Sequence, residues 1–449
     1  MGEHDVIVIG AGLSGLVCAR RLQEAGQRVA VVEARDRVGG RTWSKALGEG
    51  IFDLGGQWLG PGQRRVATLA DQLGVETFPT YCEGRHVFCG KGRRTTYHGT
   101  IPRIALRGLA GLGLSIARLE LLMRRISVSE PWSARGAAEL DARTGASVVD
   151  GWIQPEGRAS FDVAVKTIFG AEPADLSLLF MAWYTKAGEG FFNLVDVRGG
   201  AQERRFVRGA QALSLALADQ LGRTHLYLEA PVDVVGETAG GVVVRSGDRS
   251  FEARRVVVAL PPPQVAKIRF EPELPAARQR LVEAARMGSA IKVHALYPRA
   301  FWRDAGLSGE AVFEEGPLSV MFDNSSHDGA QPALVGFIMA NDVEIWRTVD
   351  AETRRSAVLE SLRRAFGVDA LSPSHYLEQD WCAEPYTGGC PVALLPAGIL
   401  SGSGPAVREP CRRVHWAGTE TATHYPGYLE GAIEAGERAA REVTDRLRD

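Results

Sequence analysis

The chain of 449 residues lacks the features that mark several classes of protein. Its six cysteines form no CxxC pair and suggest no disulfide framework, so neither a zinc ribbon nor a thioredoxin-type site is indicated and no metal is expected. Lys and Arg number 52 against 54 Asp and Glu, without a polybasic tail, which gives no reason to expect nucleic acid as a partner. No apolar leader or hydrophobic tail is visible, so we expect a cytoplasmic protein without a membrane anchor.

Long uncharged apolar runs are also missing. The most apolar long segment, residues 104–126, contains four arginines and one glutamate, which argues against a membrane span. We expect one or two amphipathic helices there, broken near Gly108, Gly111 and Gly113. A peripheral surface that touches a membrane is the alternative.

What the chain does have is a glycine-rich stretch near its amino terminus. The apolar run 5–9 predicts a buried parallel strand, and Gly10, Gly12 and Gly15 follow it as GxGxxG. Gly10 allows a tight turn, Gly12 lets the backbone approach a pyrophosphate, and Gly15 lets the next helix pack close to the strand. Glu33 ends a second apolar run, where a carboxylate can bind a ribose. We interpret the stretch as a dinucleotide site; the alternative is an ordinary glycine-rich βαβ turn.

The residues after Glu33 narrow the choice of cofactor. Residues 34–42 read Ala-Arg-Asp-Arg-Val-Gly-Gly-Arg-Thr, and together with GxGxxG they resemble the amino-terminal signature of the flavin-containing amine oxidase family. That family includes monoamine oxidases, polyamine oxidases and L-amino-acid oxidases, and the resemblance implies FAD. In this part of the chain it implies contacts to FAD from Gly10, Gly12, Ser14, Gly15, Glu33, Ala34, Arg35, Gly40, Arg41 and Thr42.

Further segments continue the resemblance along nearly the whole chain, closest to the monoamine oxidase branch. Residues 52–58 match a second flavin-contacting segment, and residues 199–204, which follow Phe191 to Val197, match a further family segment. The cofactor contacts implied by these and later segments are Gly55, Gly56, Gln57, Val232, Trp381, Tyr386, Cys390, Gly418, Glu420, Gly427 and Leu429. The substrate contacts implied are Trp58, Thr167, Ile168, Val195, Gln202, Val320, Phe337 and Pro391. For Trp58 the alternative is a core tryptophan, and for Gln202 a turn residue that faces water.

Lys292 and Tyr428 are the residues for which the resemblance implies a catalytic role. Lys292 lies in an alternating segment, 289–297, that predicts a strand. The family's aligned lysine holds a water against flavin N5, whereas a lysine on a strand is ordinarily a solvated edge residue. Tyr428 matches one of the two aromatic side chains that enclose the amine in monoamine oxidases.

The segment around Cys390 both supports and weakens the match. Cys390 directly follows a glycine pair, where monoamine oxidases attach their flavin through a cysteine thioether, although some family members lack the bond. Pro391 stands where the second enclosing aromatic residue would be, so that ring is missing unless the side chain of Trp58 or Tyr386 occupies its place. A wider or differently shaped pocket is therefore our hypothesis.

The predicted fold is α/β, with a Rossmann-like FAD-binding domain that includes a β-meander and with an inserted α+β substrate-binding domain. We expect the FAD-binding domain to comprise residues 1–80, 205–290 and 381–449, and the substrate-binding domain to comprise 81–204 and 291–380. The meander is expected to contain four short strands between residues 232 and 259. Beyond it, residues 429–447 predict a helix with one buried face.

The predicted activity is FAD-dependent oxidative deamination of a small-molecule primary or secondary amine by hydride transfer to flavin N5, with O₂ reduced to H₂O₂. An L-amino-acid oxidase, which would need an inward-facing arginine such as Arg85 or Arg198, remains an alternative. So do a polyamine oxidase, a membrane-bound flavin-dependent desaturase and a non-catalytic flavoprotein scaffold. A homodimer is one option for the assembly.

Overall fold

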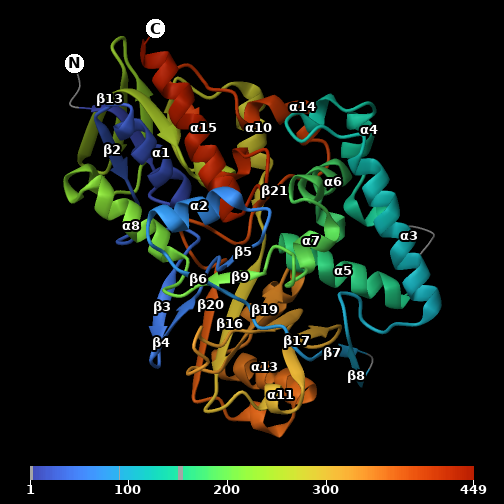
Figure 1. Ribbon diagram of the computed structural model, residues 1–449. Helices are drawn as coiled ribbons and strands as arrows, with labels where there is room; N and C mark the ends of the chain where they lie inside the picture. Colours follow the sequence, from blue (N-terminus) through green and yellow to red (C-terminus); the bar gives the residue numbers. More distant parts are fainter. Residues whose placement is uncertain (1–3, 91, 150–154, 449) are drawn as a thin grey trace.

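Two large β-sheets and a group of helices make up the computed structural model, which describes residues 4–90, 92–149 and 155–448. In Figure 1 the amino-terminal segments (blue) and the carboxy-terminal helix (red) lie side by side at the upper left, next to one sheet. The second sheet lies below, and helices from residues 100–200 (teal and green) lie at the right.

The eight-stranded sheet combines strands from three distant parts of the chain. Its order is β10 (Leu226–Tyr227), β2 (Val29–Val32), β1 (His4–Ile9), β13 (Arg249–Val258), β12 (Val242–Ser246), β11 (Val234–Glu237) and β14 (Arg269–Glu271), and β22 (Val414–Trp416) also pairs with β13. β1 runs parallel to β2 and β13, with Ile9 opposite Val32 and Val258. The carboxyl ends of these strands therefore meet at one edge of the sheet.

Residues 232–259 form three strands, so the prediction of four is wrong. The third and fourth predicted runs are one strand, β13, whose first half pairs with β12 and whose second half pairs with β1. Arg254 and Arg255, between the two runs, donate hydrogen bonds to backbone oxygens near the chain's end and do not interrupt the strand. β13 thus joins the meander to the parallel part of the sheet.

Four helices accompany this sheet: α1 (Leu13–Glu24), α2 (Arg64–Gln72), α8 (Gln211–Leu221) and α15 (Leu429–Arg448). α15 lies along α1 (Figure 1). Its predicted buried face is confirmed from Leu429 to Val443. The approach to α1 is so close that a Cβ at Gly436 would lie 2.4 Å from the backbone oxygen of Ser14.

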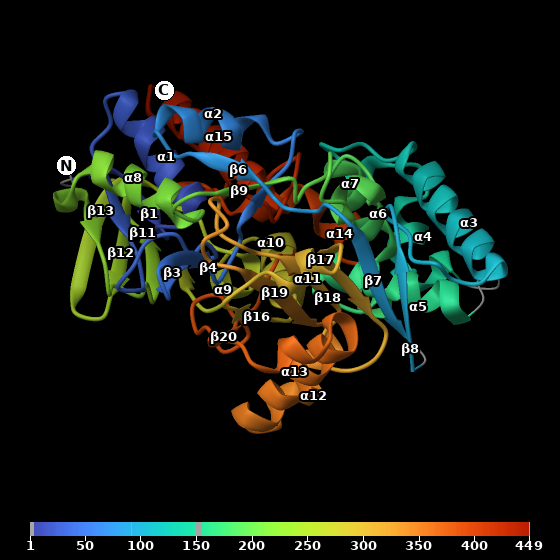
Figure 2. The same ribbon diagram turned by 60° about the horizontal axis from the view of Figure 1, so that its bottom comes forward.

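The seven-stranded sheet runs in the order β20 (His375–Asp380), β16 (Ala290–Leu296), β19 (Ala333–Met339), β18 (Val320–Asp323), β17 (Leu307–Phe313), β7 (Arg85–Gly90) and β8 (Arg93–Tyr97). Figure 2 shows α12 (Asn341–Arg347) and α13 (Ala351–Phe366) on its outer side. β16 lies between β20 and β19 and is buried along its whole length. Lys292 on β16 is therefore not an edge residue.

Shorter pairings connect the two large sheets. β5 (Trp58–Leu59) and β6 (Thr77–Pro79) both pair with β9 (Arg204–Phe206), and β3 (Ser44–Leu47) forms a hairpin with β4 (Gly50–Asp53). β15 (Arg286–Met287) pairs with β21 (Ala393–Leu394). Next to this pair, Cys390 N donates to Gly288 O (2.8 Å), which holds Cys390 beside the start of β16. The short helices α9 (Pro262–Val265), α10 (Ala276–Ala284), α11 (Phe301–Asp304) and α14 (Leu400–Ser403) complete these connections.

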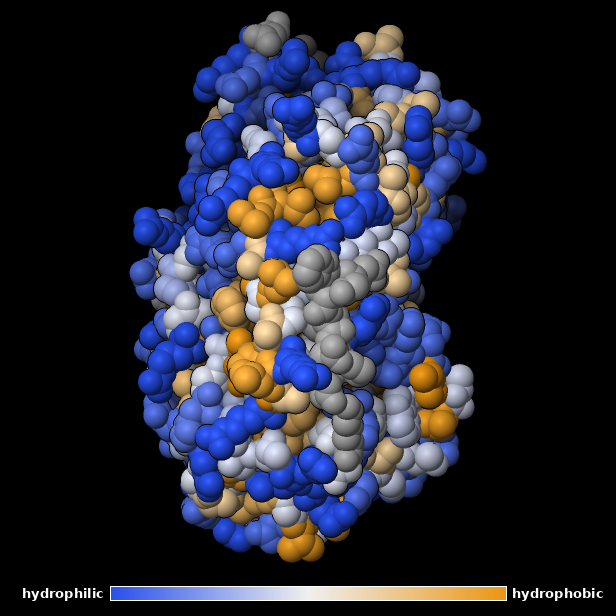
Figure 3. All heavy atoms as spheres, turned by 90° about the vertical axis from the view of Figure 1, so that its right-hand side faces the viewer, coloured by the Kyte–Doolittle hydropathy of each residue, from blue (hydrophilic) through white to orange (hydrophobic). Residues whose placement is uncertain are grey.

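The helical part contains α3 (Leu106–Met123), α4 (Ala137–Asp141), α5 (Pro155–Phe169), α6 (Leu178–Ala187) and α7 (Phe191–Val195). α3 is continuous, so the predicted break near its glycines is wrong; Gly108 and Gly111 are buried and allow close packing instead. The face that carries α3 shows hydrophobic patches among hydrophilic residues (Figure 3), and Leu106, Leu109, Leu114 and Leu121 are exposed on this helix. Within the described parts of the chain, no helix has the length and apolar character needed to cross a membrane.

We expect the variant Gly436→Ala to lower the melting temperature, because the added Cβ would press on the backbone of α1. Overpacking of this kind costs about 1–3 kcal/mol. Gly113→Ala is the matched control, since nothing lies within 4 Å of its new Cβ. The control gains helix propensity of about 0.5–1 kcal/mol and should melt at or slightly above the wild-type temperature. Scanning calorimetry checks both; equal melting temperatures for the two variants would contradict the tight contact between α1 and α15.

Candidate active site

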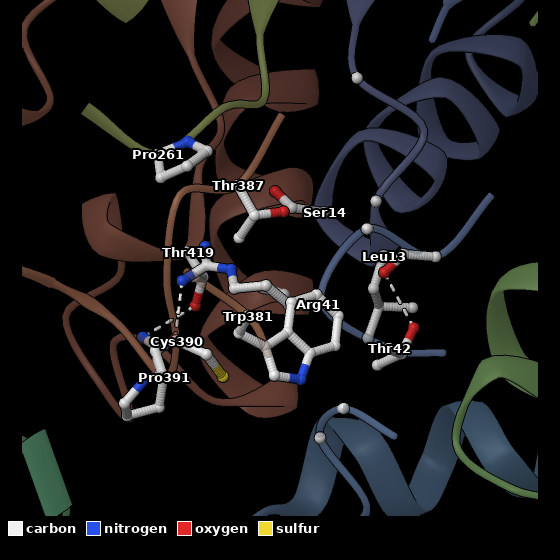
Figure 4. Close-up of a pocket in the computed structure, with 18 of the residues that line it drawn as sticks. Leu13, Ser14, Arg41, Thr42, Pro261, Trp381, Thr387, Cys390, Pro391 and Thr419 are labelled. Carbon is white, nitrogen blue, oxygen red and sulfur yellow. Dashed lines mark hydrogen bonds between the residues drawn. The ribbon is translucent and has the colours of Figure 1, made fainter. Parts of the chain in front are cut away.

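A cavity of about 430 Å³ is lined by both large sheets and by helices α5, α6 and α15. Every site residue predicted from the sequence lines it except Gly15, Val320, Gly418 and Glu420, which lie behind its wall. Figure 4 shows part of the cavity, with Leu13 and Ser14 on one side and Cys390, Pro391 and Thr419 on the other.

Two glycine turns form one end of the cavity. Gly10 has a φ of +101° and Gly40 of +57°, conformations that favour glycine, and Gly12 pairs with Gly39 in an isolated bridge. A Cβ at Gly15 would lie 2.0 Å from Gly10 O, so this glycine allows α1 to close onto β1. No side chain caps the amino terminus of α1. The result is a surface of backbone N–H groups and a positive helix end, which suits a pyrophosphate.

Glu33 stands directly after β2 beside these turns and is only 4% exposed. Its carboxylate accepts hydrogen bonds from the backbone N–H of Ala11 (2.7 Å) and of Arg35 (2.9 Å). These bonds hold the carboxylate in one orientation at the cavity wall. Each oxygen retains capacity to accept from a ribose hydroxyl.

Arg41 crosses the middle of the cavity wall (Figure 4). Its guanidinium donates to Pro391 O (2.8 Å) and to both oxygens of Glu420 (2.7 and 3.2 Å). Burial by itself lowers the pKa of Arg41, but the charge and hydrogen bonds of Glu420, together with Cys390 and Tyr184, raise this pKa above its ordinary value. Gly418 precedes Glu420 by two residues. It lies so close to Leu260 that a Cβ added at Gly418 would be 2.6 Å from the backbone oxygen of Leu260. Glu420 and Gly418 therefore support the wall from behind.

Lys292 is 2% exposed and reaches the cavity from β16. Its Nζ donates to Gly55 O (2.8 Å) and to Gln57 Oε1 (2.5 Å). Burial lowers the pKa of Lys292 to about 7, although the nearby Asp53 carboxylate acts in the opposite direction. Near neutral pH the amine is thus present in both its charged and its neutral form.

Aromatic side chains line the cavity next to Lys292. The Trp58 ring packs against Phe322 and Phe337, with centroid distances of 5.5 and 5.9 Å. Lys292 Nζ lies 5.5 Å from the centroids of Trp58 and Phe337. Val320 is buried in the same apolar cluster, one layer behind the wall.

Tyr428, at the start of α15, has an aromatic neighbour in the wall that was not predicted. This neighbour is Tyr184 on α6, with a centroid distance of 6.3 Å. Burial raises the pKa of both phenols. Tyr386 instead lies by the Arg35 guanidinium (5.6 Å from carbon to ring centroid), and Trp58 is held by its two phenylalanines.

The combination of a dinucleotide-type turn and a buried lysine between aromatic rings agrees with comparisons to known proteins. The model of the family "flavin containing amine oxidoreductase" matches residues 13–444. The chain belongs to this family. Over 99% of its length it is 36% identical to "probable flavin-containing monoamine oxidase A" of Dictyostelium discoideum, covering 98% of that protein. It is 37% identical to "amine oxidase [flavin-containing] A" of Equus caballus, of which it covers 85%.

Solved structures of other amine oxidases share the fold. Cyclohexylamine oxidase from Brevibacterium oxydans IH-35A superimposes with a TM-score of 0.96 at 35% identity, covering 99% of this chain and all of that one. Putrescine oxidase, in a structure bound to putrescine, gives 0.93 at 32% identity over 99% of both chains. The predicted two-domain α/β fold and the assignment as an amine oxidoreductase are thereby confirmed.

As a flavin-containing amine oxidoreductase the enzyme uses a flavin, and its cavity fits such a group. The glycine turns leave room for a pyrophosphate where a Cβ at Gly12 would meet nothing within 4 Å. Glu33 offers acceptors, and Arg41 offers a positive charge that Glu420 holds in place. The amino-terminal end of α15 adds a second positive helix end at the wall, formed by Gly427, Tyr428 and Leu429.

Cys390 lies in the wall of the amine oxidoreductase cavity, close to Arg41 and Lys292. Burial raises the pKa of its thiol to about 11, although the two cations oppose this shift. The thiol is therefore protonated at neutral pH, which limits its reactivity toward external oxidants.

Several residues of the cavity wall were missed by sequence reasoning. They are Leu13, Tyr184, Ala201, Pro261, Gln264, Phe322, Met339, Thr387 and Thr419, among others. Nearly all of α6 is buried, so its sequence has no hydrophobic periodicity that would distinguish Tyr184 from an ordinary core residue. Phe322 and Met339 lie on strands. The sequence could not show which face of the sheet their side chains are on, because this depends on the pairing of β18 and β19. Thr387 had a usable signal, because it directly follows Tyr386 in a segment already assigned to the cofactor.

We expect the contribution of Lys292 to stability to grow as the pH rises from about 7. The unfolded state keeps this lysine protonated up to its ordinary pKa near 10.4, whereas the native state releases the proton near pH 7. The unfolded state then binds more protons, so native stability increases with pH by at most about 1.4 kcal/mol per unit. The melting temperature of the wild type minus that of Lys292→Met should rise between pH 7 and pH 9. The exposed Lys45, changed to Met, is the control and should give a constant difference; a constant difference for Lys292→Met as well would show that its pKa is ordinary.

Proposed function

We propose that the chain oxidises a primary or secondary amine to an aldehyde plus ammonia or an amine, with FAD as cofactor and O₂ as acceptor. The observation that carries the proposal is one cavity in which the glycine turns, Lys292 and an aromatic wall come together. The chemistry that FAD supplies when bound is acceptance, at N5, of a hydride equivalent from the carbon beside the amine, followed by reoxidation with O₂ to H₂O₂.

In this proposal the cavity has two functional ends. One lies at the glycine turns, and the other, the aromatic end, lies around Lys292, Trp58 and Phe337. Glu33 would hold the ribose, and the glycine turns, the start of α1 and Arg41 the pyrophosphate. The start of α15 would place its positive dipole end toward the flavin ring and stabilise negative charge there. Lys292 lies beside the aromatic end, where it would hold a water or a proton at Nζ.

The same division applies to the domains. The strands of the eight-stranded sheet all come from residues 1–80, 205–290 and 381–449, which we propose as the FAD-binding domain. The seven-stranded sheet and helices α5–α7 supply most of the aromatic end, which supports residues 81–204 and 291–380 as the substrate-binding domain.

The charges along the cavity favour a simple amine over an amino acid or a polyamine. Its two lining arginines are engaged: Arg35 with Glu384 (3.2 Å) and Arg41 with Glu420. Arg85 and Arg198, the candidates considered for an L-amino-acid oxidase, do not line the described cavity; both are exposed, and Arg198 pairs with Glu83. An α-carboxylate would find no free guanidinium among the described lining residues.

No lining acid faces the aromatic end either. The acidic residues of the described wall are Glu33, beside the glycine turns, and Asp233, which accepts from Gly247 N at the start of the meander. A second ammonium group of a polyamine would therefore have no carboxylate partner there. The apolar surroundings also favour the neutral amine, the form that can donate hydride.

Pro391 supports a broader pocket than that of an enzyme with two enclosing aromatic rings. It lines the cavity without presenting a ring face, and Tyr428 is accompanied by Tyr184 instead. The solved neighbours are named for cyclohexylamine and putrescine, which are saturated amines. A saturated ring or chain beside a primary amine is accordingly the substrate class we favour.

A peroxide assay across an amine panel tests this function. We expect H₂O₂ from saturated cyclic and aliphatic primary monoamines, weaker activity with diamines, and none with L-amino acids, because the described lining residues offer no free guanidinium for the carboxylate. Boiled enzyme with free FAD is the blank. Preference for L-amino acids would replace the proposed function, and activity confined to tyramine and phenethylamine would refute the broad pocket.

We also propose that FAD is attached through a thioether to Cys390, on the support of its place in the wall next to Arg41 and Pro391. After acid precipitation the yellow colour should stay in the pellet for the wild type and move to the supernatant for Cys390→Ala. Cys382→Ala is the matched control, because this half-buried cysteine does not line the cavity, and its colour should stay in the pellet. Colour in the wild-type supernatant would show that the cofactor is bound without a covalent bond.

A further inference from the structure

Behind Lys292, a row of buried polar groups leads away from the cavity. Gln57 Oε1 accepts from Lys292, and Gln57 Nε2 donates to Asn324 Oδ1 (3.0 Å). The same Oδ1 accepts from Arg205 Nη1 (2.6 Å). Gln57 and Asn324 are each 2% exposed, so both side chains are shielded from bulk water. The row therefore links Arg205 to Lys292 without a gap.

The direction of each hydrogen bond in the row follows from Arg205. A guanidinium only donates, so the atom of Asn324 that faces it must be the amide oxygen. That oxygen can only accept, so Gln57 must turn its NH₂ toward Asn324. Gln57 is then left with its oxygen facing Lys292.

His294 requires the same orientation of Asn324 independently. Its Nε2 faces the backbone oxygen of Asp53 (3.0 Å) and therefore carries the proton. Burial lowers the pKa of His294 well below its usual value, so the ring is neutral and Nδ1 is an acceptor. The Asn324 NH₂ accordingly donates to Nδ1 (3.3 Å), and its oxygen points the other way, toward Arg205 and Gln57.

Strand pairing and backbone hydrogen bonds fix the position of Arg205 at the end of this row. β9 places it opposite Trp58 of β5, one residue after Gln57, and its guanidinium lies over the Phe78 ring (4.6 Å). It is 7% exposed, and no ion pair within 4 Å joins it to a carboxylate among the described residues, although the charges of Asp323 and Asp53 act on it from farther away. Its remaining hydrogen bonds go to the backbone oxygens of Asn324 and Ser325, and it borders a separate polar cavity of about 230 Å³. A buried cation without a carboxylate in direct contact is costly, because burial outweighs the attraction of these more distant charges, which argues for a role other than stability.

These contacts determine how many hydrogen-bonding positions remain free on Lys292 Nζ. Bonds to Gly55 O and Gln57 Oε1 occupy two of them, which leaves one for whatever occupies the cavity. In the ammonium form this position is an N–H donor, and in the neutral form it is a lone pair. With the Gln57 amide reversed, Nζ would face a donor and lose one of its two anchors.

We propose that Arg205 is a positioning residue for Lys292 and acts through Asn324 and Gln57. It orients both amides, and they hold Nζ with one bonding position directed to the cavity. This inference deepens the proposed function and rests on the role given there to Lys292.

A double-mutant cycle on the loaded enzyme tests the proposal, with anaerobic flavin reduction by an amine as the measurement. Arg205→Met should slow reduction roughly 10- to 100-fold when Lys292 is present, because small misplacements of a catalytic group have effects of this size. In the Lys292→Met background the same change should have almost no further effect. Arg205→Lys, which keeps a cationic donor for Asn324, should recover most of the loss.

Arg204→Met is the matched control for the cycle. Arg204 is the neighbouring residue on β9, but its guanidinium bonds Thr77 Oγ1 and Thr77 O (3.0 Å each) and has no link to the row. This variant should reduce its flavin at the wild-type rate. Asn324→Ala interrupts the row at another point, keeps the test available if Arg205→Met does not fold, and should repeat its effect.

A second readout uses the protein without flavin. Removing the charge of Arg205 should move the Lys292-dependent rise of melting temperature to higher pH, whereas Arg204→Met should not. The other charged or titratable groups that act on Lys292, namely Asp53, Cys390 and His294, are unchanged in both variants.

The outcomes distinguish a failure of the positioning role of Arg205 from a failure of the role proposed for Lys292. Equal losses from Arg205→Met with and without Lys292, together with an unshifted pH dependence, would overturn the positioning role. Unchanged flavin reduction in Lys292→Met alone would instead remove Lys292 from the proposed function, while the pH shift would still report on its coupling to Arg205.

Discussion

Parallel pairing of β1 with β2 on one side and β13 on the other brings three strand ends to one edge of a sheet, and β22 joins them beside β13. The turns after these strands carry Gly10, Glu33, Pro261 and Gly418, which come from three distant parts of the chain. Because a parallel sheet needs long crossovers, the chain leaves and returns several times, and each return adds one part of the cavity wall. The second sheet and the helices are built from the segments between these returns.

The charged groups around the cavity are stabilised in two different ways. Arg41 and Arg35 are paired with the carboxylates of Glu420 and Glu384 at the cavity wall. Lys292 has only uncharged oxygens as direct partners, so burial brings its pKa close to neutrality. Fixed cations at the glycine-turn end suit phosphate, whereas a lysine that can gain or lose a proton suits the end at which we propose that the amine reacts.

The aromatic end of the cavity departs from a simple pair of rings around the substrate. Pro391 lines the cavity without an aromatic ring, Tyr184 accompanies Tyr428, and Trp58 belongs to a cluster with Phe322 and Phe337. The apolar end is thus shaped largely by residues from the second sheet and the helical part, whereas the glycine turns lie beside the first sheet. In the proposed function, substrate choice can change through the former residues without disturbing the glycine turns.

Local chemistry in the sequence determined the glycine turns, Glu33, the strand around Lys292 and the buried face of the last helix, because each depends on the spacing of residues within one segment. The same local reasoning failed for α3 and β13, where packing against distant segments keeps a glycine-rich helix and an arginine-interrupted strand continuous. Only the tertiary structure placed Tyr184 beside Tyr428 and joined residues 57, 205, 292 and 324 in one row of hydrogen bonds. The physical reason is that such contacts depend on strand register and on the direction of side chains from elements far apart in the chain, which no pattern within a single segment records.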